Sequence, residues 1–306
     1  MKVLVTGATG FAGTWLIREL EAAGHEAVEM PPSSALDITD RSAVTTFVHA
    51  ARPEAIAHLA AISFGPEARR DPQRATAVNV GGTSAILSAA AELGRIPVLV
   101  ASSAEVYGAP APEDLPLRET APLRATQPYG LSKIETEDAA LAPSVGVPVA
   151  VVRSFNHTGP GQRLEFVVPA IAARIARAAN RRERTIAAGN VDVRRDLSDV
   201  RDVVRAYRLV LEALANGDLP AGRRVYNVAS GQAVAIRDVV NALVAIAGID
   251  VEIEIDPDLV RTDDPPEIRG DASLIASDLG WRPTIPLEVT LRDVYMDVCA
   301  RPVATR

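Results

Sequence analysis

Short aliphatic runs alternate with longer segments of helical periodicity through the first half of the chain, and this alternation most constrains the fold. Strands buried on both faces of a sheet read as continuous apolar runs, and the helices between them cover those faces. Aliphatic runs lie at 2–6, 26–30, 55–59, 97–102 and 148–154, and helices are predicted at 11–23, 40–51, 75–93 and 128–141. The pattern predicts an α/β protein with a Rossmann-type, doubly wound parallel sheet.

After Phe155 the alternation becomes irregular, and a loop with the sequence HTGPGQ follows. Helices are predicted at 167–180, 200–216, 236–247, 272–279 and 287–300, with a strand at 251–255. The length of 306 residues accommodates two domains. We expect a Rossmann domain over 1–155, to which part of 195–230 returns, and a smaller, interleaved and discontinuous α/β substrate-binding cap, mainly over 156–306.

The composition excludes several classes of protein. A net charge of −7 argues against a general nucleic-acid or anionic-membrane binder, which needs an excess of Lys and Arg. The single cysteine, Cys299, forms no bridge within the chain, and the four histidines form no cluster with metal-ligand spacing, so we expect a cytoplasmic protein without a metal site. The N-terminus lacks the continuous apolar stretch of a signal peptide, and nowhere do 18 apolar residues run together, so neither a signal peptide nor a membrane span is predicted.

A glycine-rich turn joins the first predicted strand to the first helix. The sequence VLVTGATGFAG places Gly7, Gly10 and Gly13 there. Glycines at this spacing allow a tight turn and close approach of the backbone to a pyrophosphate at the helix N-terminus. A plain strand-to-helix turn is the alternative, but three glycines within the first βα unit favour a dinucleotide site.

The end of the second strand bears on which dinucleotide binds. NAD sites usually carry an acidic residue there, which binds the ribose hydroxyls. This chain has Met30-Pro31-Pro32-Ser33 instead. The missing carboxylate favours NADP(H); NAD(H) remains possible, because no arginine follows directly and the backbone with Ser33 and Ser34 could hold a ribose.

Two further motifs carry candidate chemical groups. SSAEVYG places Ser102, Ser103 and Glu105 at the carboxyl end of strand 97–102, where open α/β sheets bind ligands. YGLSK places Tyr129 and Lys133 four residues apart, on one face of a predicted helix. A nearby ammonium lowers the pKa of a phenol, and a serine hydroxyl can hold the reacting oxygen while the tyrosine passes a proton. Alone the Tyr/Lys pair could be a solvated surface pair; together with the glycine turn and Ser103 it indicates a proton-transfer site.

The motifs TGATGFAG, HLAA, NVGGT, SSAEVYG and YGLSK, in this order, resemble the extended short-chain dehydrogenase/reductases, and the resemblance covers essentially the whole chain. It implies a catalytic set of Ser103, Tyr129 and Lys133, with Glu105 beside it. It places Asp37 and Ile38 at the adenine. The complete implied cofactor site consists of Gly7, Thr9, Gly10, Phe11, Ala12, Gly13, Asp37, Ile38, Leu59, Ala60, Ala61, Asn79, Ala101, Tyr129, Lys133 and Phe155.

Arginine-bearing motifs in the second half suggest the substrate. RSFNHTGPGQ, RRDLSDVRDVV and RTDDPPEIRGD combine arginines, which grip phosphate, with carboxylates, which accept from sugar hydroxyls. Each could instead form a surface ion pair. In the family, matching motifs bind a nucleoside-diphosphate sugar. The resemblance therefore implies a substrate site of Ser103, Asn156, Val167, Arg195, Arg261 and Asp264.

Within that family, FNHTGPGQ and the motif around 200 are most similar to enzymes of GDP-sugar metabolism. These are the 4-ketoreductases that convert GDP-4-dehydro-6-deoxy-D-mannose to GDP-D-rhamnose, and the GDP-mannose 4,6-dehydratases. The compact length favours the reductases. Glu105 retains the acid that a dehydratase needs, so a dehydratase or an epimerase with tightly bound cofactor is the alternative. A non-catalytic NAD(P) sensor should lack the Tyr/Lys pair.

Small residues in helices 75–93 and 128–141 would allow close helix packing between two subunits. A homodimer is therefore plausible, although packing of the two helices within one chain explains the small residues equally well.

Overall fold

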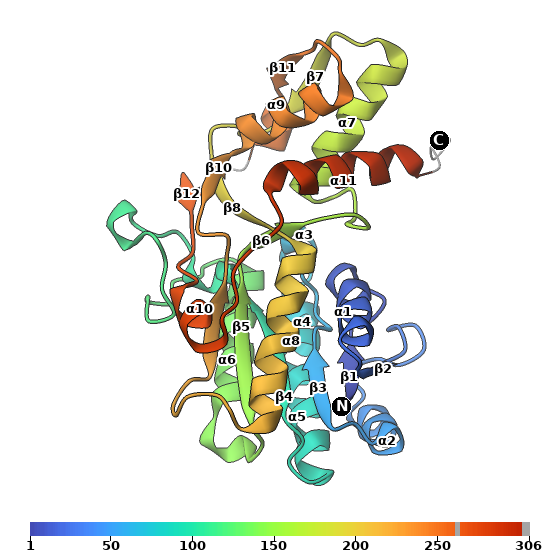
Figure 1. Ribbon diagram of the computed structural model, residues 1–306, viewed down its shortest axis with the longest axis vertical. Coiled ribbons are helices and arrows are strands. Elements are labelled where there is room, and N and C mark those ends of the chain that lie inside the picture. Colours follow the sequence, from blue (N-terminus) through green and yellow to red (C-terminus); the bar gives the residue numbers. More distant parts are fainter. Residues whose placement is uncertain (261–263, 302–306) are drawn as a thin grey trace.

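Five strands from the first half of the chain and one from the second half build a six-stranded parallel sheet in the order β2-β1-β3-β4-β5-β9. The computed structural model describes residues 1–260 and 264–301. The strands of the sheet are β1 (Lys2–Thr6), β2 (Glu26–Glu29), β3 (Ala55–His58), β4 (Val98–Ser103), β5 (Val149–Ser154) and β9 (Val225–Val228). The doubly wound α/β fold predicted from the sequence is confirmed (Figure 1).

Alternate residues of each strand face opposite layers of helices, as the period of two in a strand requires. In β1, Val3 and Val5 pack toward one layer, whereas Leu4 packs toward the other. The first layer contains α1 (Phe11–Ala22) and α8 (Val200–Asn216). The second contains α2 (Arg41–Ala51), α5 (Gly82–Glu92) and α6 (Pro128–Leu141). Both faces of the sheet are therefore dry, and its polar groups gather at the strand ends.

The connections from β1 and β3 leave the sheet toward opposite faces. The α1 connection after β1 lies in the first layer, and the α5 connection after β3 lies in the second. Such a switch opens a crevice at the carboxyl ends of the two strands, which is where open α/β sheets bind ligands.

A smaller unit lies above this edge of the sheet (Figure 1). Its central strand β8 (Arg194–Asp199) pairs with three short strands, and α7 (Val167–Arg181), α9 (Ile236–Ala247) and α11 (Leu287–Ala300) share an apolar core with it. The remaining strands are β6 (Asn156–Thr158), β10 (Ala233–Ala235), β12 (Glu267–Ile268) and the parallel pair β7 (Thr185–Ala188) and β11 (Glu252–Ile255). We call this unit the cap.

The chain does not stay in the cap once it has entered it. Helix α8 returns to the first layer and β9 adds the sixth strand, while α10 (Ser273–Leu279) and Trp281 pack on the same side. The short 3₁₀ turns are Ala104–Tyr107, Pro112–Asp114, Pro143–Val145 and Pro257–Leu259.

The helix prediction at 75–93 was only partly right, and a helix before it was missed. The single helix predicted at 75–93 is three consecutive segments: α4 (Pro72–Thr76), a π-helical turn (Ala77–Gly81) and α5. A short helix α3 (Gly65–Arg70), which was not predicted, precedes them. The π-helical turn widens the helix where Asn79 makes contacts described below.

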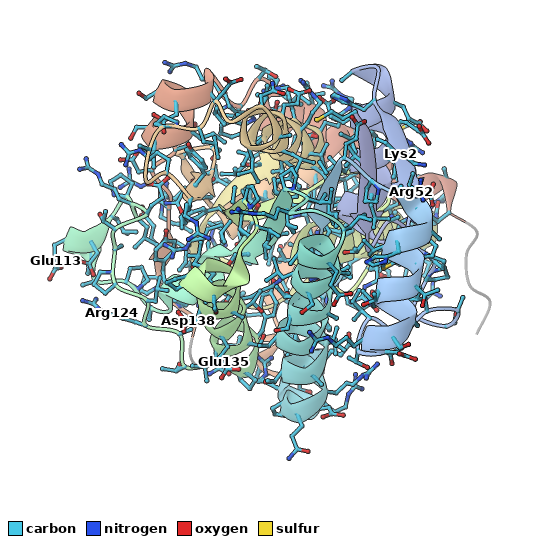
Figure 2. The ribbon with its side chains drawn as sticks, turned by 90° about the horizontal axis from the view of Figure 1, so that it is seen from below. Lys2, Arg52, Glu113, Arg124, Glu135 and Asp138 are labelled. Atoms are coloured by element: carbon cyan, nitrogen blue, oxygen red, sulfur yellow. The ribbon has the colours of Figure 1, made fainter. Side chains whose placement is uncertain are left out.

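Figure 2 views the molecule from the side opposite the cap, and Arg52, Glu135 and Asp138 are exposed. Within residues 1–260 and 264–301, none of the helices combines the length and the hydrophobicity needed to cross a membrane.

Candidate active site

The glycine turn after β1 leaves no room for side chains. Gly7 has φ +66°, and a Cβ there would lie 2.9 Å from the backbone nitrogen of Ala60. A Cβ on Gly13 would lie 2.1 Å from the carbonyl oxygen of Gly7. Gly10, at the N-cap of α1, offers no side chain to cap the helix, so the first N–H groups of α1 remain available to an anion. This is the cradle that a diphosphate requires.

The loop after β3 is held against this turn by Thr6. The Thr6 hydroxyl accepts hydrogen bonds from the backbone N–H of Leu59, at 3.1 Å, and of Ala60, at 3.0 Å. It also lies 2.8 Å from Nδ1 of His58. The backbone of Leu59 and Ala60, which the resemblance implies to lie beside the cofactor, is thereby fixed in position.

The buried His58 side chain extends this chain of hydrogen bonds. Its Nε2 lies 3.0 Å from the hydroxyl of Thr83, which donates at 2.6 Å to the carbonyl of Asn79. Because the Thr83 proton is used there, His58 Nε2 must donate and Nδ1 must accept from Thr6. Burial and the positive charge of Lys133 lower the pKa of His58 to about 3, which keeps the ring neutral.

Asn79 joins the β3 loop to the helix that carries the tyrosine. Its amide oxygen accepts from the N–H of Ile62 at 2.8 Å, and its amide nitrogen donates to the Ile62 carbonyl at 3.2 Å and to Ser132 at 2.9 Å. Ser132 in turn donates to the carbonyl of Tyr129 at 2.7 Å. Thus Asn79, which the resemblance assigned to the cofactor site, makes contacts that position both walls of that site.

At the far end of the crevice, Asp37 forms a charged anchor. Its carboxylate accepts from Thr39 N–H at 2.9 Å and from Arg74 Nη2 at 2.9 Å. These hydrogen bonds, that of Thr39 foremost, lower the pKa of Asp37 to about 2. Ile38 is buried beside Gly82. This is where the resemblance places the adenine.

Ser103, Tyr129 and Lys133 converge where β4 ends beside α6. The Ser103 hydroxyl is near enough to the phenol of Tyr129 to lower its pKa. Lys133 Nζ donates at 2.8 Å to the carbonyl of Ala101. Ser103 also accepts from the backbone N–H of Glu105 at 3.2 Å, so the start of the 3₁₀ turn after β4 holds its hydroxyl.

The pKa of the Tyr129 phenol is raised, which differs from the lowering expected from the sequence. Loss of water around the half-buried ring is the main cause, and the charge of Glu105 adds to it, while the Ser103 hydroxyl opposes it. Burial lowers the pKa of Lys133 to about 8, against the effect of Glu137. At neutral pH the site therefore holds a protonated phenol beside an ammonium.

The segment after β5 closes the site from the cap side. Phe155 is buried, and Asn156 is exposed on β6. The ring of His157 stacks on Phe11, with centroids 6.0 Å apart, and its Nδ1 lies 3.1 Å from the Phe155 carbonyl. His157 was not among the residues predicted for the site, although its position directly after Phe155 and Asn156 could have indicated it.

Two of the residues implied for the substrate meet in the cap. Arg195 Nη2 lies 2.9 Å from a carboxylate oxygen of Asp264, and Arg195 Nη1 donates to the Pro265 carbonyl at 2.9 Å. Val167 begins α7 and is 41% exposed. Arg261 lies outside the described residues.

The remaining residues implied for the cofactor lie in the glycine turn and in the loop after β3. Thr9 and Ala12 flank Gly10 and Phe11 in the glycine turn and the first turn of α1, and Ala61 follows Ala60 in the loop after β3. A protonated tyrosine, a lysine and a serine above a glycine-lined anion cradle define an enzyme of the short-chain dehydrogenase/reductase class.

Comparison with known proteins agrees with this class. A family model described as GDP-mannose 4,6 dehydratase matches residues 33–294. The GDP-6-deoxy-D-mannose reductase of Pseudomonas aeruginosa is 36% identical, over 97% of this chain and 96% of that protein. The chain belongs to the GDP-mannose 4,6-dehydratase family, and the resemblance drawn from its motifs is confirmed.

Solved structures show the same architecture. The P. aeruginosa structure described as RMD complexed with NADPH has a TM-score of 0.87 and 33% identity, and the match covers 98% of this chain and 99% of that one. A UDP-glucose 4-epimerase of Thermus thermophilus, in complex with NAD, has a TM-score of 0.84 and 26% identity, covering 98% and 99% of the two chains.

Proposed function

We propose that this protein is a nucleotide-sugar 4-ketoreductase that reduces GDP-4-dehydro-6-deoxy-D-mannose to GDP-D-rhamnose, with NADPH as the preferred cofactor. The observation that carries the proposal is the convergence of Ser103, Tyr129 and Lys133, with the tyrosine protonated at neutral pH. The 36% identical relative named as a GDP-6-deoxy-D-mannose reductase supports the choice of substrate.

The residues present fit a nicotinamide dinucleotide. The amides at Gly7–Gly13 would hold the diphosphate, Asp37 and Ile38 the adenine, and Tyr129 and Lys133 the nicotinamide ribose. When bound, the cofactor supplies a hydride to C4 of the sugar.

The chain's own groups complete the reduction. The hydroxyls of Ser103 and Tyr129 hold the keto oxygen, and Tyr129 gives up its proton to that oxygen as the carbonyl becomes an alcohol. The ammonium of Lys133 stabilises the phenolate that remains, and solvent later returns the proton. One hydride and one proton thus convert C=O to CH–OH.

The preference for NADP rests on the end of β2. The N–H of Met30 still bonds to the sheet, at 2.9 Å from the Val5 carbonyl, and Pro31 follows directly. A proline has no carboxylate to repel a 2′-phosphate. The related RMD structure contains NADPH, although the epimerase contains NAD.

We assign substrate recognition to the cap. Arg195, Asp264 and Asn156 lie on the cap side of Ser103, and Val167 offers an apolar contact for the base. We further propose that 1–155 together with α8 and β9 form the cofactor domain, and that the rest forms the substrate cap. An unpaired, exposed Cys299 supports a cytoplasmic enzyme.

A hydride-transfer assay tests the function. Purified protein is mixed with GDP-4-dehydro-6-deoxy-D-mannose and either NADPH or NADH, nucleotide oxidation is followed by its ultraviolet absorbance, and the product is identified by NMR. We expect stoichiometric formation of GDP-D-rhamnose, faster with NADPH. The proposal fails if the ketone remains unreduced with both cofactors.

The exposed Glu105, close enough to Tyr129 to affect its pKa, favours a second candidate. A carboxylate there could remove the proton next to a 4-keto group, as a 4,6-dehydratase requires. Incubation with GDP-mannose and no added reductant distinguishes the two. Accumulation of the 4-keto sugar would support the dehydratase.

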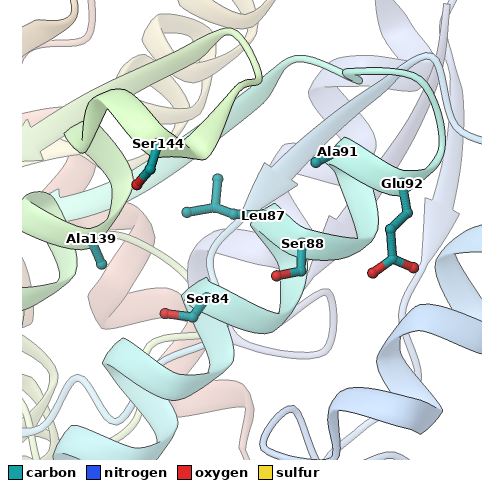
Figure 3. A pocket seen from close by; sticks show the side chains of 7 residues that line it. All are labelled: Ser84, Leu87, Ser88, Ala91, Glu92, Ala139 and Ser144. Atoms are coloured by element: carbon teal, nitrogen blue, oxygen red, sulfur yellow. The ribbon is translucent and has the colours of Figure 1, made fainter.

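We propose a homodimer formed through α5 and α6. A hollow of about 370 Å³ lies between them. Figure 3 shows the side chains that line it, most of them small, from both helices and the turn after α6. The lining residues are Ser84, Leu87, Ser88, Ala91, Glu92, Ala139 and Ser144. A second copy of this face could fill the hollow with helix-to-helix contacts.

A further inference from the structure

A buried ion pair lies under the proposed catalytic site. Glu137 on α6 is 2% exposed and Arg153 on β5 is 5% exposed. The pairing is two-pronged: Arg153 Nε donates to Glu137 Oε1 at 2.9 Å, and Nη2 donates to Oε2 at 2.6 Å. Removing two charges from water is costly unless geometry and further hydrogen bonds compensate, so the surroundings of the pair matter.

Those surroundings join three strands of the sheet to α6. Ser102, which directly precedes Ser103 on β4, donates at 2.5 Å to Glu137 Oε1. Arg153 Nη1 donates to the hydroxyl of Tyr107 at 3.0 Å, and Tyr107 donates at 2.6 Å to Asn227 on β9. The network therefore ties the helix to β4, β5 and β9 at the level of the site.

Glu137 continues the row of residues that carries the chemistry. Tyr129, Lys133 and Glu137 are each four residues apart on α6, so they lie on one face of the helix, one turn apart. Fixing Glu137 against Ser102 and Arg153 thus fixes the height of Lys133 beside Ala101 and of Tyr129 beside Ser103.

Among the groups around Lys133 described below, Glu137 is the one that carries a negative charge. From β3 Lys133 faces the neutral His58, from β4 the Ala101 carbonyl, and from α6 Tyr129 and Glu137; Arg153 stands behind Glu137. Glu137 raises the pKa of Lys133 against the effect of burial.

We propose that Glu137, held by Arg153 and Ser102, is a positioning residue that fixes α6 against the sheet and keeps Lys133 charged. The inference rests on the proposed function, because it takes Lys133 to act on the cofactor ribose and on Tyr129.

The test compares Glu137→Gln with Asp138→Asn. Asp138 is the next residue and is exposed (Figure 2). Its substitution by Asn removes the same charge without changing the hydrogen-bond network around Glu137. NADPH affinity is measured by fluorescence titration across neutral and alkaline pH, with no sugar present. In the wild type, affinity should fall as pH rises through about 8, where Lys133 loses its proton.

In Glu137→Gln this fall should begin about 0.5–1 pH unit lower, because the carboxylate that favours the ammonium is gone. With substrate, kcat should fall at least about tenfold near neutral pH, by analogy with other misplaced catalytic groups. Asp138→Asn should match the wild type in both the pH dependence of NADPH affinity and kcat. Identical pH dependence in the two variants would overturn the proposal.

A second variant guards against simple loss of folding. Glu137→Gln leaves Arg153 buried without its partner, whereas Glu137→Gln combined with Arg153→Gln removes both charges and should unfold at higher urea than the single variant. The double variant should recover stability but not kcat, because neither charged partner then anchors α6. Its pH dependence should lie between those of the wild type and the single variant, since the positive charge of Arg153 is removed together with the negative charge of Glu137. If stability and kcat recover together, the pair is only structural.

The binding titration also separates this inference from the proposed function. If the fall in NADPH affinity is shifted in Glu137→Gln but the wild type does not reduce the keto sugar, the role of Glu137 stands and the proposed substrate is wrong. If the wild type reduces the keto sugar but the fall in affinity is not shifted, the proposed function stands and the role of Glu137 is wrong.

Discussion

At the scale of single residues, the chemistry depends on which group keeps its proton at neutral pH. Tyr129 keeps its own, because the ring has little water around it and Glu105 stands near. A reductase needs this form, since the tyrosine must donate. Lys133, with a pKa of about 8, is the group whose deprotonation should limit activity in alkaline solution.

Removing the Tyr129 hydroxyl tests its role directly. Tyr129→Phe should lower kcat by about 10²–10⁴, because positioned acid catalysis contributes that much. NADPH affinity should change little, since the glycine cradle remains and Lys133 still holds the nicotinamide ribose. Tyr295→Phe, on α11 in the cap, is the control and should keep full activity. Comparable kcat in the two variants would remove Tyr129 from the mechanism.

The sequence shows only part of this site. Ser103, Tyr129 and Lys133 were predictable because each stands in a short motif with a defined position on a strand or helix. The Thr6–His58–Thr83 chain was not, because its members are 25 and 52 residues apart and meet only when the sheet forms. The direction of the Tyr129 pKa shift was missed for a similar reason. It depends on burial, which no local pattern reveals.

At the scale of elements, the sequence pattern predicted most long helices and the apolar strands well, but it missed the polar and very short strands of the cap. Helices α8 and α9 have the bounds that periodicity predicts. Strand β8 contains the sequence RRDLSD and was not predicted, because its polar residues are buried by partners from distant segments. Asp196, for example, accepts from Ser230 N–H at 2.7 Å and from Gly231 N–H at 3.0 Å.

Two adjacent glycines where the π-helical turn meets α5 should respond in opposite ways to substitution by alanine. Gly81 has helical φ, and a Cβ there would meet nothing within 4 Å, whereas a Cβ on Gly82 would lie 2.9 Å from two side-chain carbons of Ile38. Gly81→Ala should stabilise the protein by up to ~1 kcal/mol, because alanine favours a helix. Gly82→Ala should destabilise it by ~1–3 kcal/mol through overpacking.

Urea unfolding measures both changes. Gly82→Ala should also weaken NADPH binding, because the displaced Ile38 lines the proposed adenine site, and Gly81→Ala should not. Equal stability of the two variants would contradict the packing described for Ile38.

At the scale of the whole molecule, an acidic protein must bind an anionic ligand. With a net charge of −7, it offers no general attraction for phosphates. In the proposed function, recognition therefore rests on oriented groups: the amides of the glycine turn on the sheet side, and Arg195 beside Asp264 on the cap side. The alternation of the first half predicted five strands of the sheet, and the sixth, β9, joins them from the segment 195–230 that was expected to return to this domain.

The oligomeric state belongs to this scale and can be tested at the hollow between α5 and α6. Ala91 is exposed on α5 and lines that hollow. Ala91→Arg should convert a dimer to a monomer, because a long charged side chain would be forced into a helix-to-helix contact. Asn216→Arg, at the end of α8 in the opposite layer of helices, adds the same charge and should leave the dimer intact. Light scattering during gel filtration gives both masses, and a dimer that survives in Ala91→Arg would place the interface elsewhere.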